Sequence, residues 1–458
     1  MSTMALAKYV SGLKFEDLPA PVVEQAKNVV QDCIGLCAFV GRNTPSGRVI
    51  SEFAIDQGGG QAEATVIGYP KKTVATRAAL ANGTTAYAYE YNDIYVPAPC
   101  HIYPIIVPAA LAVAELLGSS GRDLLTAIVA GVEVHGKVGR ASGKSRGRGT
   151  LGRGLVSSRV YGVFGAAAAA SKLLGLDAEW TARAMGMSAD YAGGCFQGMA
   201  EGAWTRNWHG GLGAEAGVIS ALLAKRGFVG PLRALEGEQN IYRTLALDFD
   251  PPKLTEGLGK GFEISNIWFK RYPVNGAWQG GVEAVLDLIK ENHIDHKQVA
   301  QVRGHIFELT RLHEKKEAPN IVVAQFSLSY CLAVALVKGK VTVDEFTDEA
   351  LKDPTTLAFS QDKVEAVFDE DLQAIGMEQE TMPTRVVIKM KDGREYSKEV
   401  LFPRGHRRNP MSPEELKAKF DGLATRALPA DKVSQLYQAL RGLDKAKSVS
   451  HLNKLMTP

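Results

Sequence analysis

Apolar residues recur at helical spacing through the first half of the chain, and this periodicity constrains the fold more than any other feature. The stretch that begins after Pro21 is typical, because its apolar side chains fall three or four residues apart. They are Val22, Val23, Ala26, Val29, Val30, Cys33, Ile34 and Cys37. Similar stretches, separated by short turns that contain glycine, cover residues 75–89, 107–117, 124–138, 162–174, 180–187 and 211–225. This half of the chain is therefore predicted to be nearly all α-helical.

Several of these predicted helices are rich in alanine and glycine. The run 165–170 is one glycine followed by five alanines, and the chain has 47 glycines. Small side chains allow helix backbones to approach one another closely. The composition therefore favours a bundle of several helical layers.

The pattern changes after residues 250–252, where a linker with glycine and lysine begins. The segments that follow alternate between helix and strand, and a hairpin turns at Asp392 and Gly393. The predicted elements are helices 280–292 and 323–337 and strands 302–309, 364–368, 385–390 and 394–401. Ser412 and Pro413 then open a helical tail that we expect to pack on the first domain. The prediction is a mainly α fold, with a helical domain formed by 1–266 plus 403–458 and an inserted α+β domain formed by 267–402.

The charge and cysteine content exclude several classes of protein. The 53 basic and 50 acidic residues give a net charge of +3 and are spread along the chain, so no surface for nucleic acid or an anionic membrane is expected. None of the five cysteines forms a CxxC pair, and His293 and His296 have no third ligand nearby, so no metal is expected. The N-terminus lacks the apolar core of a secretory signal, which predicts a cytoplasmic protein.

A candidate acid/base pair lies between two predicted helices. Asp93 is predicted to end one helix, and His101 follows on a loop that is rich in proline and poor in charge. Such a carboxylate and imidazole can converge and exchange protons with a substrate. Each residue also has a structural alternative, with Asp93 as a helix cap and His101 as a buried core imidazole. Because they occur together in such a loop, we favour the acid/base interpretation.

From this stretch onward the sequence resembles the MmgE/PrpD family, which includes the 2-methylcitrate dehydratases. Motifs similar to those of the family occur in the same order at 82–112, 154–170, 227–231, 270–273, 326–330 and 405–410. The resemblance implies a helical domain built from both chain ends, an inserted lid domain and a homodimer. It also implies an active site between domain and lid that uses neither metal nor organic cofactor.

The sequence departs from the family at three chemical positions. Many members have a histidine where this chain has Val156, a lysine where it has Arg206, and often a histidine where it has Gln279. Arg206 keeps the positive charge and gains a planar fork for a carboxylate, although a surface ion pair is its alternative. Trp204, Trp208 and Trp278 lie near these motifs, either as part of a less polar pocket or as core residues.

The function predicted from these features is a cofactor-independent lyase that moves a proton at the carbon beside a carboxylate. His101 and Asp93 would form the acid/base unit, and Arg206 would bind the carboxylate. Tyr330 and Gln279 would hydrogen-bond the substrate from the lid, and Tyr330 would also be catalytic. The structural alternative for Tyr330 is an aromatic side chain that packs in a helix. The basic run 144–149 would attract an anionic substrate. Dehydration is the first prediction, decarboxylation or epimerisation the second, and an inactive ligand-binding relative the alternative from another class.

Overall fold

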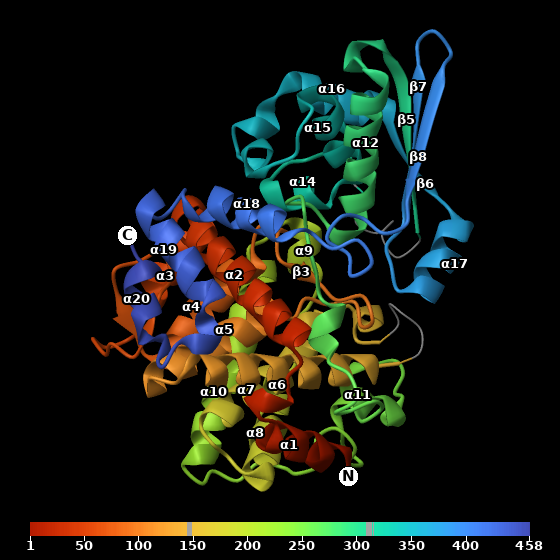
Figure 1. Cartoon of the computed structure of the whole chain (residues 1–458). Helices are drawn as coiled ribbons and strands as arrows, with labels where there is room; N and C mark the ends of the chain where they lie inside the picture. The colour runs from red at the N-terminus through yellow and green to blue at the C-terminus, as the bar shows by residue number, and fades with distance from the viewer. Residues whose placement is uncertain (144–148, 308–313, 315) are drawn as a thin grey trace.

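A computed structural model describes residues 1–143, 149–307, 314 and 316–458. The chain is mainly α, as predicted, and a small sheet lies at one end of the molecule (Figure 1). The N-terminal helices are α1 (Ser2–Gly12), α2 (Ala20–Asn43), α3 (Pro45–Asp56), α4 (Ala75–Tyr87), α5 (Tyr103–Leu117), α6 (Gly121–Arg140), α7 (Ser157–Leu173), α8 (Ala178–Ser188), α9 (Gln197–Glu201), α10 (Thr205–Lys225) and α11 (Ile241–Leu245). Among the described residues, no helix is long and apolar enough to cross a membrane.

Glycines set the distance between α4 and α10, the two helices that lead into the site. A Cβ atom added at Gly210 would lie 2.4 Å from the main-chain oxygen of Gly83, and one added at Gly211 would lie 2.2 Å from that of Leu80. The two backbones therefore touch, as the abundance of glycine predicts. This contact brings the end of α4, with Tyr87, beside the start of α10, with Arg206.

The C-terminal tail packs against the N-terminal helices, as predicted (Figure 1). It contains α18 (Pro413–Ala424), α19 (Ala430–Arg441) and α20 (Leu452–Leu455). A Cβ atom added at Gly35 of α2 would lie 2.9 Å from the Phe420 ring of α18. Lys419 of α18 also forms a buried ion pair of 2.8 Å with Asp32 of α2. Both chain ends therefore belong to one helical body.

The segment between this body and the tail forms a sheet covered by helices. Its elements are α12 (Gln279–Asn292), β5 (Val299–Ile306), α14 (Ile321–Phe326), α15 (Leu328–Lys338), α16 (Pro354–Lys363), β6 (Val364–Phe368), α17 (Glu370–Gln379), β7 (Thr384–Met390) and β8 (Glu395–Val400). The strand order is β6-β5-β7-β8, and only the β5–β6 pair is parallel. The β7–β8 hairpin turns at Gly393, whose φ is +89°, as the Asp-Gly pair predicts. The domain limits 266/267 and 402/403 stay a prediction.

His135 lies at the centre of the helical body without a hydrogen bond. It belongs to α6, is fully buried, and neither ring nitrogen has a partner among the described residues. Gly162 and Gly165 of α7 leave room for its side chain, because an added Cβ atom would lie 3.3 Å and 2.9 Å from it. Burial lowers the pKa of His135 to about 3.

We expect His135 to make the fold sensitive to acid. The unfolded chain takes up a proton at this side chain below about pH 6.5, whereas the folded protein does so only near pH 3. Stability is therefore lost as the pH falls from 6.5 toward 3, by about 2 kcal/mol at pH 5. Urea unfolding of His135→Leu at pH 7 and pH 5 should show a smaller loss than the wild type. The exposed His451→Leu is the control, and equal losses in both variants would contradict the prediction.

Candidate active site

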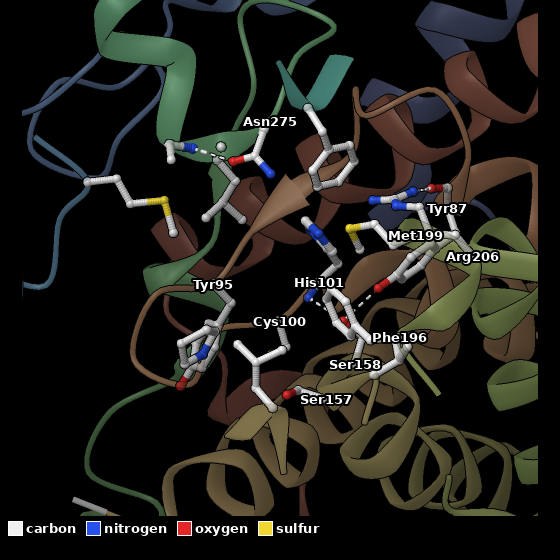
Figure 2. A pocket seen from close by; sticks show the side chains of 18 of the residues that line it. Tyr87, Tyr95, Cys100, His101, Ser157, Ser158, Phe196, Met199, Arg206 and Asn275 are labelled. Atoms are coloured by element: carbon white, nitrogen blue, oxygen red, sulfur yellow. Dashed lines mark hydrogen bonds between the residues drawn. The ribbon is translucent and has the colours of Figure 1, made fainter. Parts of the chain in front are cut away.

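A cavity of about 130 Å³ lies where the helical body meets the α+β segment. Tyr87, His101 and Arg206 reach it from the helical body, and Asn275 and Phe326 reach it from the other side. Figure 2 shows Tyr87, His101, Arg206 and Asn275 around one space, with Ser157 and Ser158 in the lower part of the view. The sequence predicted a site between these two parts of the chain, and two of its proposed residues, His101 and Arg206, line this cavity.

Four helices begin beside the cavity. His101 precedes α5, Ser157 opens α7, Arg206 is the second residue of α10, and the turn at Gly276 leads into α12. The amino end of a helix carries unpaired N–H groups and a partial positive charge. The first N–H groups of α5 already donate to Asp93 and that of Ala277 to Asn275, so the start of α7 and the charge of Arg206 make the cavity suited to an anionic group such as a carboxylate.

The turn after α4 places a buried carboxylate behind the cavity. Tyr89 and Glu90 both have left-handed backbones, with φ of 70° and 49°, which is costly for residues other than glycine. This turn directs Glu90 between two cations, Arg206 of α10 and Lys270 of the segment that enters the α+β part. The Lys270 Nζ atom lies 2.7 Å from a Glu90 oxygen, and both side chains are buried. The three charges therefore form one ion-paired unit.

Arg206 is held firmly in the cavity wall. It forms an ion pair with Glu90 and donates from Nη1 to the main-chain oxygen of Tyr87 over 2.9 Å. Its guanidinium lies over the rings of Tyr87 and Phe326, at 5.0 Å and 5.3 Å. Burial lowers the pKa of Arg206 to about 10, so it stays charged at neutral pH. Its five N–H donors are not all used by these partners.

The main chain at Asp93 orients the imidazole of His101. His101 Nδ1 lies 2.6 Å from the Asp93 carbonyl oxygen, which can only accept a hydrogen bond. Nδ1 therefore carries the hydrogen, and Nε2 is the basic atom. Burial, and then the charge of Lys270, lower the pKa of His101 to about 3. The imidazole is therefore neutral in the empty site, and its role as an acid/base group stays a prediction.

The carboxylate of Asp93 has a different partner from the predicted one. Helix α4 ends at Tyr87, and Asp93 lies in β3 (Asp93–Ile94), which pairs with β4 (Trp268–Phe269). Asp93 Oδ2 accepts from the main-chain N–H groups of Ile102 and Tyr103 over 2.8 Å and 3.1 Å, so it caps α5. Burial raises the pKa of Asp93 to about 7. Asp93 thus positions His101 through the backbone, while its carboxylate does not contact the ring.

Gln279 and Tyr330 are placed outside the cavity wall. The Gln279 carboxamide accepts from the N–H groups of Arg271 and Tyr272 and donates to the carbonyls of Tyr272 and Val274. These four hydrogen bonds use both N–H donors and both lone pairs of the carboxamide oxygen, and they hold the backbone conformation between Lys270 and Asn275. Tyr330 packs in the core of the α+β part, 6.0 Å from Phe346 between ring centres. The predicted contact of either side chain with a substrate is not seen here.

Several site residues were not singled out by the sequence. Ser158 Oγ accepts from the Tyr87 hydroxyl over 2.8 Å and from the His101 N–H over 2.9 Å, which leaves its own hydrogen to donate elsewhere. Glu90 and Lys270 belong to the segments 82–112 and 270–273, which resemble the family. Nothing in their spacing along the sequence indicated that they form an ion pair. Trp278 is buried, whereas Trp204 and Trp208 are exposed and do not line the cavity. Most of the basic run 144–149 lies outside the described residues.

The fold and the site define an enzyme whose candidate cavity lies between a helical body and an α+β part. Models of the MmgE/PrpD N-terminal and C-terminal domains match residues 4–253 and 272–445, so the chain belongs to the MmgE/PrpD family. Relatives include the cis-aconitate decarboxylase-like protein oryM of Aspergillus oryzae, 29% identical over 99% of this chain and 97% of its own. The cis-aconitate decarboxylases of Aspergillus terreus and Homo sapiens are 27% and 25% identical, over 99% of this chain and 95% and 94% of theirs.

We expect Gln279 to be needed for stability. In Gln279→Ala, two N–H groups and two carbonyls of the segment 271–274 lose their partner, which should lower the free energy of unfolding by about 2–4 kcal/mol. Urea denaturation measures this loss. The exposed Gln301→Ala, which breaks a bond to Glu365, should cost less than about 0.5 kcal/mol. Equal stability of the two variants would show that the Gln279 bonds are not needed.

Proposed function

We propose that the protein is a lyase that removes or adds a proton at the carbon beside the carboxylate of a small acid. The observation that supports this most directly is the contact of His101 Nδ1 with the Asp93 carbonyl, which leaves Nε2 as a base beside a cavity that Arg206 and the start of α7 make favourable to an anion. Arg206 and the start of α7 would hold the carboxylate and the enolate-like charge that develops when the proton leaves.

Dehydration is the first reaction that this arrangement supports. His101 Nε2 takes the proton from the carbon next to the carboxylate, and that electron pair forms the carbon–carbon double bond. The bond to the hydroxyl on the neighbouring carbon breaks, and the imidazolium returns the proton to it, so that water leaves. One base is enough, and the Ser158 hydroxyl can hydrogen-bond the leaving oxygen.

Decarboxylation is the second candidate, because the relatives compared above carry that name. In that case the bond to a carboxylate breaks, carbon dioxide leaves, and the imidazolium gives a proton to the carbon that receives the electrons. Both reactions, and an epimerisation, share the same stabilised carbanion. Because neither reaction needs an oxidant or a reductant and Arg206 can stabilise the developing negative charge, we propose that neither a metal nor an organic cofactor takes part.

Substrate binding should make His101 a stronger base. Its pKa is low because the ring is buried near Lys270, and a bound carboxylate adds a negative charge that favours the imidazolium. The empty enzyme would thus keep His101 neutral and ready to accept a proton. The α+β part, which would act as the lid, and the apolar cavity walls would increase this rise in the pKa of His101 by excluding water.

We expect His101→Ala to lose proton transfer while it stays folded. Exchange of the hydrogen beside the carboxylate, followed by NMR in D₂O with a panel of carboxylic acids, should fall by about 10²–10⁴-fold. The exposed His451→Ala is the matched control and should exchange at the wild-type rate. Melting temperatures separate lost chemistry from lost fold. Wild-type exchange in His101→Ala would remove the imidazole from the mechanism, and no exchange in the wild type would favour an inactive ligand-binding relative.

We also propose a homodimer, because the family resemblance implies one. Exposed aromatic side chains near the start of α10, Trp204 and Trp208, offer apolar area for such a contact. Light scattering should give about twice the mass of the chain, and a monomer that retains activity would contradict this. A cytoplasmic location and the absence of nucleic-acid binding stay predictions.

A further inference from the structure

We infer that the substrate is a monocarboxylic acid with a short apolar tail, in contrast to the tricarboxylate named for the relatives. The inference rests on the proposed function, since it names the substrate of the same cavity. It is carried by three features: the chemistry of the walls, the balance of charge and the volume.

Apart from the region near Arg206, Ser157 and Ser158, the cavity is lined mainly by apolar side chains. They come from both parts of the chain and are Ile94, Val156, Phe196, Met199, Phe326 and Met382. Val156 stands at the position where many family members have a histidine, so this position offers no donor to a second carboxylate, and the carboxamide of Asn275 is the polar group that the α+β part contributes. A carboxylate placed against such a wall would lose its hydration without gaining partners.

The charged groups beside the cavity balance one carboxylate. Among the described residues, Arg206 is the only cation that lines it, and Lys270 lies behind it. Glu90 already pairs with both, so the three groups supply at most one positive charge in excess. A single carboxylate would neutralise that excess. Two further carboxylates would remain uncompensated in a buried site, which is strongly unfavourable.

Cations in the adjoining hollow do not change this balance. That hollow shares Pro99, Leu151 and Ser157 with the cavity and contains Arg140 and Lys253. Arg140 lies 3.0 Å from one carboxylate oxygen of Glu263, and Lys253 pairs with Glu256. Both cations therefore already have carboxylate partners within the protein.

The cavity volume also fits a small acid. It measures about 130 Å³, and a protein cavity of about 150 Å³ holds one benzene ring. An acid with a tail of three or four carbons is of this size. Cis-aconitate has about twice as many non-hydrogen atoms as benzene and would extend beyond this volume into the adjoining hollow.

Calorimetric titration with two unsaturated acids tests the inference. 2-Methylbut-2-enoate has one carboxylate and an apolar tail, and cis-aconitate has three carboxylates. The wild-type protein should bind 2-methylbut-2-enoate at least about tenfold more tightly than cis-aconitate at physiological salt. Tighter or equal binding of cis-aconitate, or no measurable binding of 2-methylbut-2-enoate, would overturn the inference.

A pair of charge variants tests the cause. Met199→Lys adds a cation to the cavity wall and should reduce the preference for the monocarboxylate by about tenfold. Phe228→Lys adds the same charge at an exposed position outside the wall and should leave the preference unchanged. Equal effects of both variants would show that the wall chemistry does not set the specificity.

The exchange assay keeps this inference separate from the proposed function. If exchange depends on His101 but occurs only with tricarboxylates, the proposed function stands and the inferred substrate is wrong. If the monocarboxylate binds with the predicted preference but no acid exchanges its hydrogen, the cavity specificity stands and the proposed function fails.

Discussion

The site depends on one buried carboxylate, Glu90, between two buried cations. Without it, Arg206 and Lys270 would lie close together in a dry environment, where the repulsion of like charges is large. Arg206 belongs to α10 of the helical body, whereas Lys270 belongs to the segment that leads into the α+β part. One carboxylate therefore fixes the position of the α+β part on the helical body, as well as the charge at the cavity. The left-handed turn at Tyr89 and Glu90 is the strained backbone that makes this possible.

The same stretch of chain orients the base. After Glu90, the backbone runs through β3, which pairs with β4 just before Lys270. The carbonyl of Asp93 holds the His101 ring, and its carboxylate caps the helix that follows His101. Residues 89–103 and 268–270 together therefore set the charge beside the cavity, the orientation of His101 and the start of the α+β part.

The fold was largely predictable from the sequence, and the site only in part. Helical periodicity and the Asp392-Gly393 turn are local signals, so the helices and the hairpin were found. Their bounds differ in places, because α10 begins at Thr205 and not at residue 211, and the predicted helix 323–337 is divided at Ser327 into α14 and α15. His101 and Arg206 were placed in the site because a sequence motif marked them. The partners of Glu90 could not be predicted, because they depend on a left-handed turn and on Lys270, which is 180 positions away. The partners of Asp93, the N–H groups of Ile102 and Tyr103, follow from the strand pairing of β3 with β4, which is not a local signal. The backbone partners of Gln279 could not be predicted, because sequence does not show which polar groups a side chain satisfies.

At Val156 and at Arg206 the residue in this chain is less strongly hydrated than the histidine or lysine that many family members have. A lysine ammonium is strongly hydrated and needs a wet site or several acceptors, whereas a guanidinium is weakly hydrated and tolerates aromatic neighbours. Arg206 lies between the rings of Tyr87 and Phe326, and Val156 removes a polar wall from the same cavity. Both changes lower the water content of the site. A drier site strengthens the attraction for one carboxylate and increases the cost of burying each additional one.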